Sequence, residues 1–113
     1  MKYGELFQCT EIPSMTLREY MHRLTTYMDL DEETYSIAKV YLQRLNFVYP
    51  IQTTTAHKQM FIALLIAKKY HEDEGSPNSY YAEIGGLSSW DLMNLELAFC
   101  YLTRFRLYVK PEN

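Results

Sequence analysis

An uninterrupted apolar segment constrains this chain more than any other feature. The eight residues 60–67, MFIALLIA, are all apolar, and Lys68 and Lys69 follow directly. A helix that is apolar on every side must be surrounded by other elements, because no face of it suits water. The segment is too short to cross a bilayer, which takes about 20 apolar residues. It therefore predicts the central helix of a small bundle, running from about Thr55 to His71.

Apolar residues at spacings of three and four predict further helices before and after this segment. We expect a first helix at about Leu17–Met28, where Thr16 and Glu19 have capping-box spacing, and a second at about Glu32–Leu45. After the central helix, the following elements are expected: a short helix at Tyr80–Ile84, a left-handed cap at Gly85–Gly86, and a last helix from Ser88 to about Thr103.

The remaining segments are predicted to be irregular. Residues 1–15 form an N-terminal arm, and residues 16–113 form the domain itself. Residues 46–54 are expected to be a loop whose Phe47, Val48, Tyr49 and Ile51 fold back onto the core. The FRLYV segment in the C-terminal tail could be a strand, but it has no second strand with which to pair. The fold class is therefore all-α, with five helices in one domain.

Composition and charge limit the classes of function. The formal net charge is −3 and the basic residues are scattered, which disfavours a nucleic-acid interface. No segment is predicted to enter a membrane. Cys9 and Cys100 form neither a disulfide framework nor a metal motif, so we expect reduced thiols and an intracellular protein, in the nucleus or cytoplasm.

Catalysis is not expected. The triplet His71-Glu72-Asp73, with His22 and His57 elsewhere, raises the alternative of a helical metal-dependent phosphohydrolase. That class uses an adjacent His-Asp pair, which is missing here. His71 is explained more simply by the negative C-terminal end of its helix. Phosphate-binding loops, dinucleotide turns and nucleophile motifs are also missing. We expect no catalytic residue, cofactor, metal or small-molecule substrate.

Two charged residues do not fit the apolar pattern of their helices. Glu96 lies within or beside the apolar stripe of the last helix, and Lys69 continues a ridge formed by Phe61 and Leu65. An unpaired buried charge is costly, so each should find a partner or reach the surface. They could form a weak ion pair at the surface. Alternatively, they could lie side by side at the edge of an apolar groove and bind the end of a partner helix. Periodicity leaves both interpretations open.

Three segments resemble the cyclin box. Residues 61–73, FIALLIAKKYHED, resemble its third helix, and residues 37–45, IAKVYLQRL, resemble its second. Residues 79–112 resemble the end of one cyclin subgroup, the phosphate-regulon or P/U type. Its marks are Asn-x-Tyr-Tyr-Ala at residues 78–82, Gly85–Gly86, Leu95-Glu96 and the Phe-Arg-Leu-x-Val tail at residues 105–109. The segment from Tyr-Tyr-Ala to Gly-Gly is the specific part.

The resemblance implies a five-helix cyclin box that binds and activates a cyclin-dependent protein kinase. In that family, residues at the positions of Lys69 and Glu96 lie together and hydrogen-bond the backbone of the kinase segment that precedes its regulatory helix. Phe61, Leu65 and Tyr80 are further candidates for the contact face. The resemblance implies mainly structural roles for Tyr70 and Phe99.

The first helix departs from cell-cycle cyclins because it lacks their Met-Arg-Ala-Ile-Leu docking patch, which makes recruitment of substrates there doubtful. The printed sequence has room for one cyclin box. A cyclin-fold adaptor or scaffold that binds protein or nucleic acid without activating a kinase is the alternative. The kinase and its pathway, whether cell cycle, phosphate response or morphogenesis, are left open.

Overall fold

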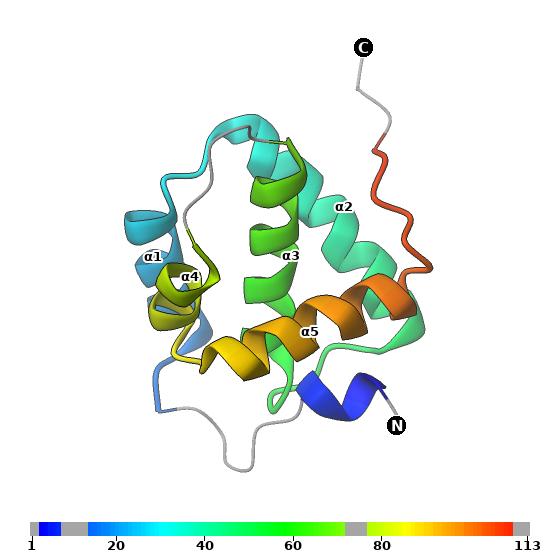
Figure 1. Cartoon of the computed structure of the whole chain (residues 1–113), viewed down its shortest axis with the longest axis horizontal. Helices are drawn as coiled ribbons and strands as arrows, with labels where there is room; N and C mark the ends of the chain where they lie inside the picture. Colours follow the sequence, from blue (N-terminus) through cyan, green and yellow to red (C-terminus); the bar gives the residue numbers. More distant parts are fainter. Residues whose placement is uncertain (1–2, 8–13, 72–76, 110–113) are drawn as a thin grey trace.

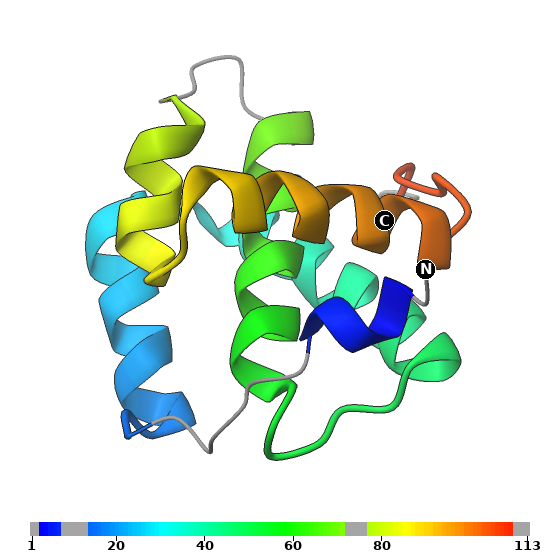
Figure 2. The same ribbon diagram turned by 60° about the horizontal axis from the view of Figure 1, so that its bottom comes forward.

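The computed structural model describes residues 3–7, 14–71 and 77–109, and these parts are helical without strands. Helix α3, Ala56–His71, lies at the centre, as predicted. Figure 1 shows α2, Glu32–Val48, on one side of α3, with α1, Leu17–Met28, and α4, Asn78–Gly85, on the other. Helix α5, Ser89–Leu102, crosses in front of α3 in Figure 2.

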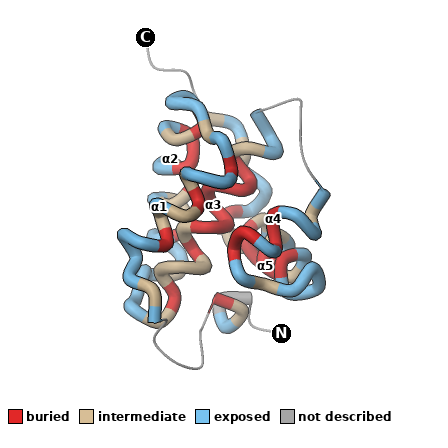
Figure 3. The backbone as a smooth tube through the Cα atoms, turned by 90° about the vertical axis from the view of Figure 1, so that its left-hand side faces the viewer, coloured by how far each residue is buried: buried red, intermediate tan, exposed pale blue. Residues whose placement is uncertain are grey.

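The core is built around α3. All residues from Phe61 to Ala67 are at most 6% exposed. The inward faces of the neighbouring helices contribute most of the other buried residues, whose backbone is coloured red in Figure 3. The all-apolar segment is therefore enclosed from every side, which confirms the sequence prediction of an all-α bundle with a central third helix.

Side-chain caps fix where three of the helices begin. The Thr16 hydroxyl accepts a hydrogen bond from the Glu19 amide at 3.1 Å, so the predicted capping box starts α1. The Ser88 hydroxyl accepts from the Asp91 amide at 3.0 Å at the start of α5. Asp31 caps α2 in the same way, since its carboxylate accepts from the Thr34 amide at 2.7 Å.

The predicted loop after the second helix is partly wrong. Helix α2 continues to Val48 rather than ending at Leu45, because the first residue that disfavours helix is Tyr49, directly before Pro50. Phe47 is 89% exposed, so it does not fold back onto the core. Val48 and Ile51 are exposed as well. Only Tyr49 of the four packs inward, with its ring 5.9 Å from that of Phe7.

The N-terminal arm contains an element that the sequence did not predict. Residues Tyr3–Phe7 form a 3-10 helix, labelled η1, that packs against α5. Phe7 is fully buried, so this short segment contributes a large side chain to the core. Helix α4 is also longer than predicted, since it begins at Asn78, directly after Pro77.

The tail after α5 lies along α2 without forming a strand in its described part. Two side chains of α2 hold it. The Tyr41 hydroxyl donates to the Leu107 carbonyl, and Arg44 Nη1 donates to the Arg106 carbonyl at 2.8 Å. Burial is the main cause that raises the pKa of Tyr41 to about 12, and the electrostatic interaction with Tyr70 raises it in the same direction. The hydroxyl therefore keeps its proton, and with it the hydrogen bond, throughout the physiological pH range.

Across the described parts of the chain, every helix is too short or too polar to span a membrane.

The cap at Asp31 predicts a pH dependence of stability. The Thr34 amide, and then the Thr34 hydroxyl, lower the pKa of Asp31 below its usual value. Its stabilising contribution is therefore complete above the unfolded pKa of about 3.9 and is lost as the pH falls through the lower folded value. We expect urea denaturation to show the advantage of wild type over Asp31→Asn shrinking between neutral pH and about pH 2.5. Asparagine also caps a helix but does not titrate. An advantage that is unchanged in acid would contradict this role.

Candidate partner-binding site

Lys69 and Glu96 meet where three helices converge. Lys69 lies in the last turn of α3 and Glu96 in the middle of α5, and their Nζ and Oε1 atoms are 2.6 Å apart. Lys69 Nζ also donates to Asn78 Oδ1, at the start of α4. The Lys69 and Glu96 side chains keep 30% and 22% of their surface exposed. The ion pair is therefore formed but remains partly exposed to solvent, so a partner protein can reach it.

The position of each charge follows from its helix. Lys69 comes four residues after the buried Leu65, and Glu96 comes directly after the buried Leu95. Each side chain therefore leaves its helix at the edge of a buried face. A pair that is this open to solvent typically contributes about 0–1 kcal/mol to stability. Stability alone is a weak explanation for placing both charges beside the core.

An apolar surface ridge lies next to the pair on α5. Trp90, Met93, Leu97 and Tyr101 are 42–68% exposed and follow spacings of three and four, which place them on one face. Glu96 comes three residues after Met93 and so flanks the ridge. Large apolar side chains gathered on one exposed helix face are typical of interaction sites. The sequence pattern did not predict this ridge, because a single buried stripe was expected for α5, whereas the helix carries apolar residues on both sides.

Two of the sequence-predicted contact residues are buried instead. Phe61 and Leu65 are 0% exposed, so they belong to the core and cannot touch a partner in this structure. Both residues lie on a helix that neighbours cover on every side, and a role for them in partner contact stays a prediction. Phe99, expected to be structural, is buried too, whereas Tyr70 is half exposed and packs edge-on against His71.

Tyr80 is exposed but is turned toward α1. Its hydroxyl donates to the Tyr27 carbonyl at 3.2 Å, and its ring lines a cavity of about 300 Å³ with Arg23 and Glu83. The structure therefore brings Lys69 and Glu96 together and leaves Tyr80 on the neighbouring face.

Comparison with known proteins decides the family. The family model for the cyclin family, described as Cyclin, matches residues 2–107. The chain belongs to the cyclin family. It is 40% identical over 107 residues to Cyclin-U2-1 of Arabidopsis thaliana, a match that covers 92% of this chain and 48% of the relative.

Two further relatives support the subgroup. Cyclin-P2-1 of Oryza sativa subsp. japonica is 34% identical over 105 residues, covering 91% of this chain and 48% of the relative. The PHO85 cyclin-like protein psl1 of Schizosaccharomyces pombe is 26% identical over 112 residues, covering 96% of this chain and 46% of the relative. The predicted P/U-type resemblance is confirmed. The chain spans about half the length of the relatives it matches.

The histidines of this cyclin lie in separate surroundings. His22 is exposed, His57 Nε2 lies 2.7 Å from the Met15 carbonyl, and His71 Nε2 lies 3.4 Å from the Tyr41 hydroxyl. Within residues 3–7, 14–71 and 77–109, no three metal-ligating side chains gather. Glu72 and Asp73, which completed the suggested phosphohydrolase triplet, lie outside the described residues. The described histidines thus give the phosphohydrolase alternative no support.

The Cys100 thiol lies one helical turn after Glu96. Burial raises its pKa, and the negative charge of Glu96 raises it further. The thiol is therefore protonated at neutral pH, which makes it a weak nucleophile.

Proposed function

We propose that this cyclin is a non-catalytic regulatory subunit that binds a cyclin-dependent protein kinase inside the cell, in the nucleus or cytoplasm, and activates it. The observation that carries the proposal is the partly exposed Lys69–Glu96 pair beside the apolar ridge of α5. The kinase-binding role at these two positions comes from the cyclin resemblance.

The chemistry of the pair suits a backbone segment of a partner. A lysine ammonium has three donors, and two of them are directed at Asn78 and Glu96, which leaves a third for a partner carbonyl. The Glu96 carboxylate uses Oε1 toward Lys69, so Oε2 can accept from a partner amide. The beginning of a helix has unsatisfied amides of this kind. The ridge residues Met93 and Leu97 can then cover the apolar side of that helix.

Activation would follow from differential affinity. A partner that binds the active conformation of a kinase more tightly than the inactive one shifts the equilibrium by the difference in binding free energy. Holding the regulatory helix in place keeps its glutamate paired with the lysine of the ATP site, which phosphoryl transfer by a kinase requires. The cyclin would hold the regulatory helix in place, and the kinase would provide the catalytic groups.

An affinity pull-down from lysate of the source cells, followed by mass spectrometry and a protein-kinase assay, tests the proposal. We expect wild type to recover an active cyclin-dependent kinase, and the double variant Lys69→Ala/Glu96→Ala to lose it. The matched control is Lys39→Ala/Glu33→Ala, which removes the same residue types from the exposed face of α2. A kinase that is recovered without activity would favour a scaffold, and recovery of no kinase would favour an adaptor.

A further inference from the structure

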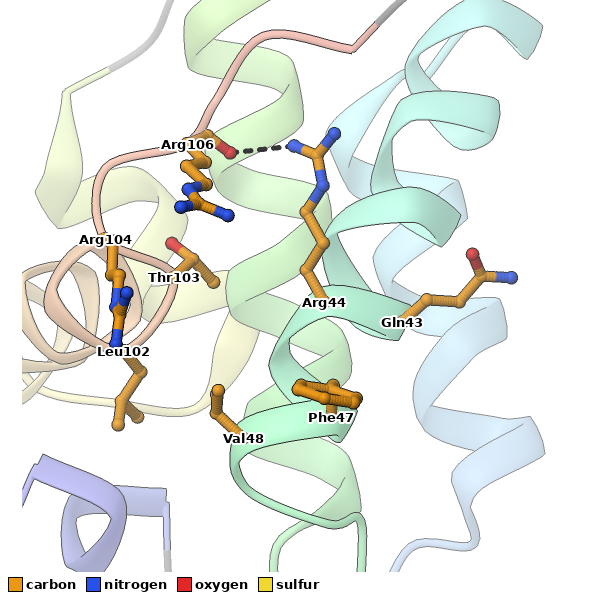
Figure 4. A pocket seen from close by; sticks show the side chains of 8 residues that line it. All are labelled: Gln43, Arg44, Phe47, Val48, Leu102, Thr103, Arg104 and Arg106. Atoms are coloured by element: carbon orange, nitrogen blue, oxygen red, sulfur yellow. Dashed lines mark hydrogen bonds between the residues drawn. The ribbon is translucent and has the colours of Figure 1, made fainter.

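A second surface feature lies at the other end of α5. A cavity of about 500 Å³ opens between the C-terminal ends of α2 and α5 and the start of the tail (Figure 4). Leu102, which lines it, comes six residues after Glu96, which corresponds to about 9 Å along the helix and about 120° around it. The cavity is therefore separate from the Lys69–Glu96 pair.

Three arginines give this cavity a positive rim. Arg44, Arg104 and Arg106 line it, and none of its lining residues is acidic. The chain as a whole has a formal net charge of −3, so this concentration of positive charge is local. None of the three forms an ion pair with a carboxylate in the described part of the chain. The C-terminal ends of α2 and α5 offset part of the positive charge of the three arginines. Their partial charges together amount to only about −1 elementary charge.

Arg104 occupies a backbone position that normally favours glycine. It follows the end of α5 with φ of 57°, in the left-handed region. The Phe105 amide donates to the Cys100 carbonyl at 2.7 Å and the Arg104 amide to the Tyr101 carbonyl at 3.1 Å, which is the Schellman pattern. Glycine would adopt this conformation without the steric cost of a side chain. An arginine here carries a conformational cost and in return places its guanidinium at the rim.

Apolar side chains accompany the arginines. Phe47 is 89% exposed and Val48 is 48% exposed, and Leu102 lies across the cavity from them. Figure 4 shows Phe47 and Val48 on the α2 side and Leu102 beside Arg104 on the α5 side, with the guanidinium groups spread around the cavity rather than meeting at one point. Arg44 is positioned by its hydrogen bond to the Arg106 carbonyl at 2.8 Å.

We propose that this cavity binds an acidic segment of a partner protein, in which several carboxylates surround one apolar side chain. The spread of the guanidinium groups suits carboxylates that are spaced along a peptide, because each arginine can form its own charge-assisted hydrogen bonds. The apolar side chain would contact Phe47 and Val48. Arginine and aromatic residues are also the types that contribute most at protein interfaces.

Titration with a short synthetic peptide tests the inference without any kinase. The peptide carries glutamates around a central leucine, and its analogues replace the glutamates with glutamine or the leucine with serine. We expect calorimetry to detect binding of the parent peptide, with affinity falling at higher salt and weaker binding of both analogues. Arg106→Gln and Phe47→Ala should each weaken binding, the arginine variant by about tenfold or more. The matched control Arg18→Gln, on the exposed part of α1, should bind like wild type.

Arg104→Gly separates binding from folding. The substitution should raise the thermal midpoint, because it relieves the left-handed strain, and should still weaken peptide binding. Amide chemical shifts of wild type should move at residues 43–48 and 102–106 on addition of the peptide. Shifts confined to the surroundings of Lys69, equal binding of the glutamine analogue, or no binding at millimolar peptide would each overturn the proposal. Complete displacement of the peptide by inorganic phosphate at low concentration would also overturn it, in favour of a phosphate site.

Discussion

Replacement of Phe61 by alanine is expected to lower the free energy of unfolding by about 3–5 kcal/mol. The ring is 0% exposed and lies in the central helix, so its removal leaves a cavity that neighbouring helices can fill only in part. Urea denaturation followed by circular dichroism measures the change. The matched control is Phe47→Ala, the same substitution at a side chain that is 89% exposed, where we expect a change within about 0.5 kcal/mol.

The neighbour that fixes the Phe61 ring is a glycine. A Cβ atom added at Gly85 would lie 2.6 Å from Phe61 Cζ, so the fully buried ring would have to shift against its neighbours. Gly85→Ala should therefore destabilise the fold by about 1–3 kcal/mol. Combining it with Phe61→Leu should cost less than the sum of the two single changes, because the smaller side chain removes the clash. Additive costs would show that the two residues do not constrain each other.

These variants also distinguish a core role from a contact role. Phe61 was predicted to lie on the kinase-contact face, whereas it is buried in the structure. If Phe61→Leu changes stability but leaves kinase affinity unchanged, the residue acts only through the core. A large loss of affinity in a variant that is still fully folded would restore the contact interpretation.

The sequence predicted the helices well where the pattern of apolar and capping residues was compatible with only one structure. The all-apolar residues 60–67 could only be a buried helix, and capping residues such as Thr16 and Ser88 marked helix starts that the structure confirms. Prediction failed where the burial of a residue depends on how the helices pack rather than on the local sequence pattern. Phe47 is apolar, but it lies on a helical turn that faces outward, and a propensity argument gives no sign of this.

The candidate site could be predicted only in part, for a related reason. Lys69 and Glu96 could be singled out because they are charged residues within or beside apolar stripes. Whether they meet, and on which surface, depends on how α3 and α5 cross, which periodicity does not give. The contact of Lys69 with Asn78 depends on where α4 begins, which the sequence placed two residues too late. The short Tyr3–Phe7 helix has too few residues to show a period.

Lys69→Ala and Glu96→Ala are each expected to weaken binding of the kinase by about 2–5 kcal/mol, or from about 30-fold to several thousand-fold. Each change leaves one charge of a partly desolvated pair without its partner, opposite a kinase backbone that has lost its hydrogen bond. Stability should change by no more than about 1 kcal/mol, since both side chains remain partly exposed. Calorimetric titration of the purified kinase recovered with wild type measures the affinity, and denaturation measures the stability.

A double-mutant cycle shows whether the two residues act as a unit. If the pair binds the kinase together, the double variant should lose little more affinity than either single variant, because the first change already disables the site. Asn78→Ala should have a smaller effect, since it removes only a group that orients the Lys69 ammonium. Unchanged affinity in both single variants would exclude the pair from the interface. The apolar ridge of α5 would then be the surface to test next, beginning with Met93→Ser and Leu97→Ser, because these side chains are exposed and their replacement leaves the core intact.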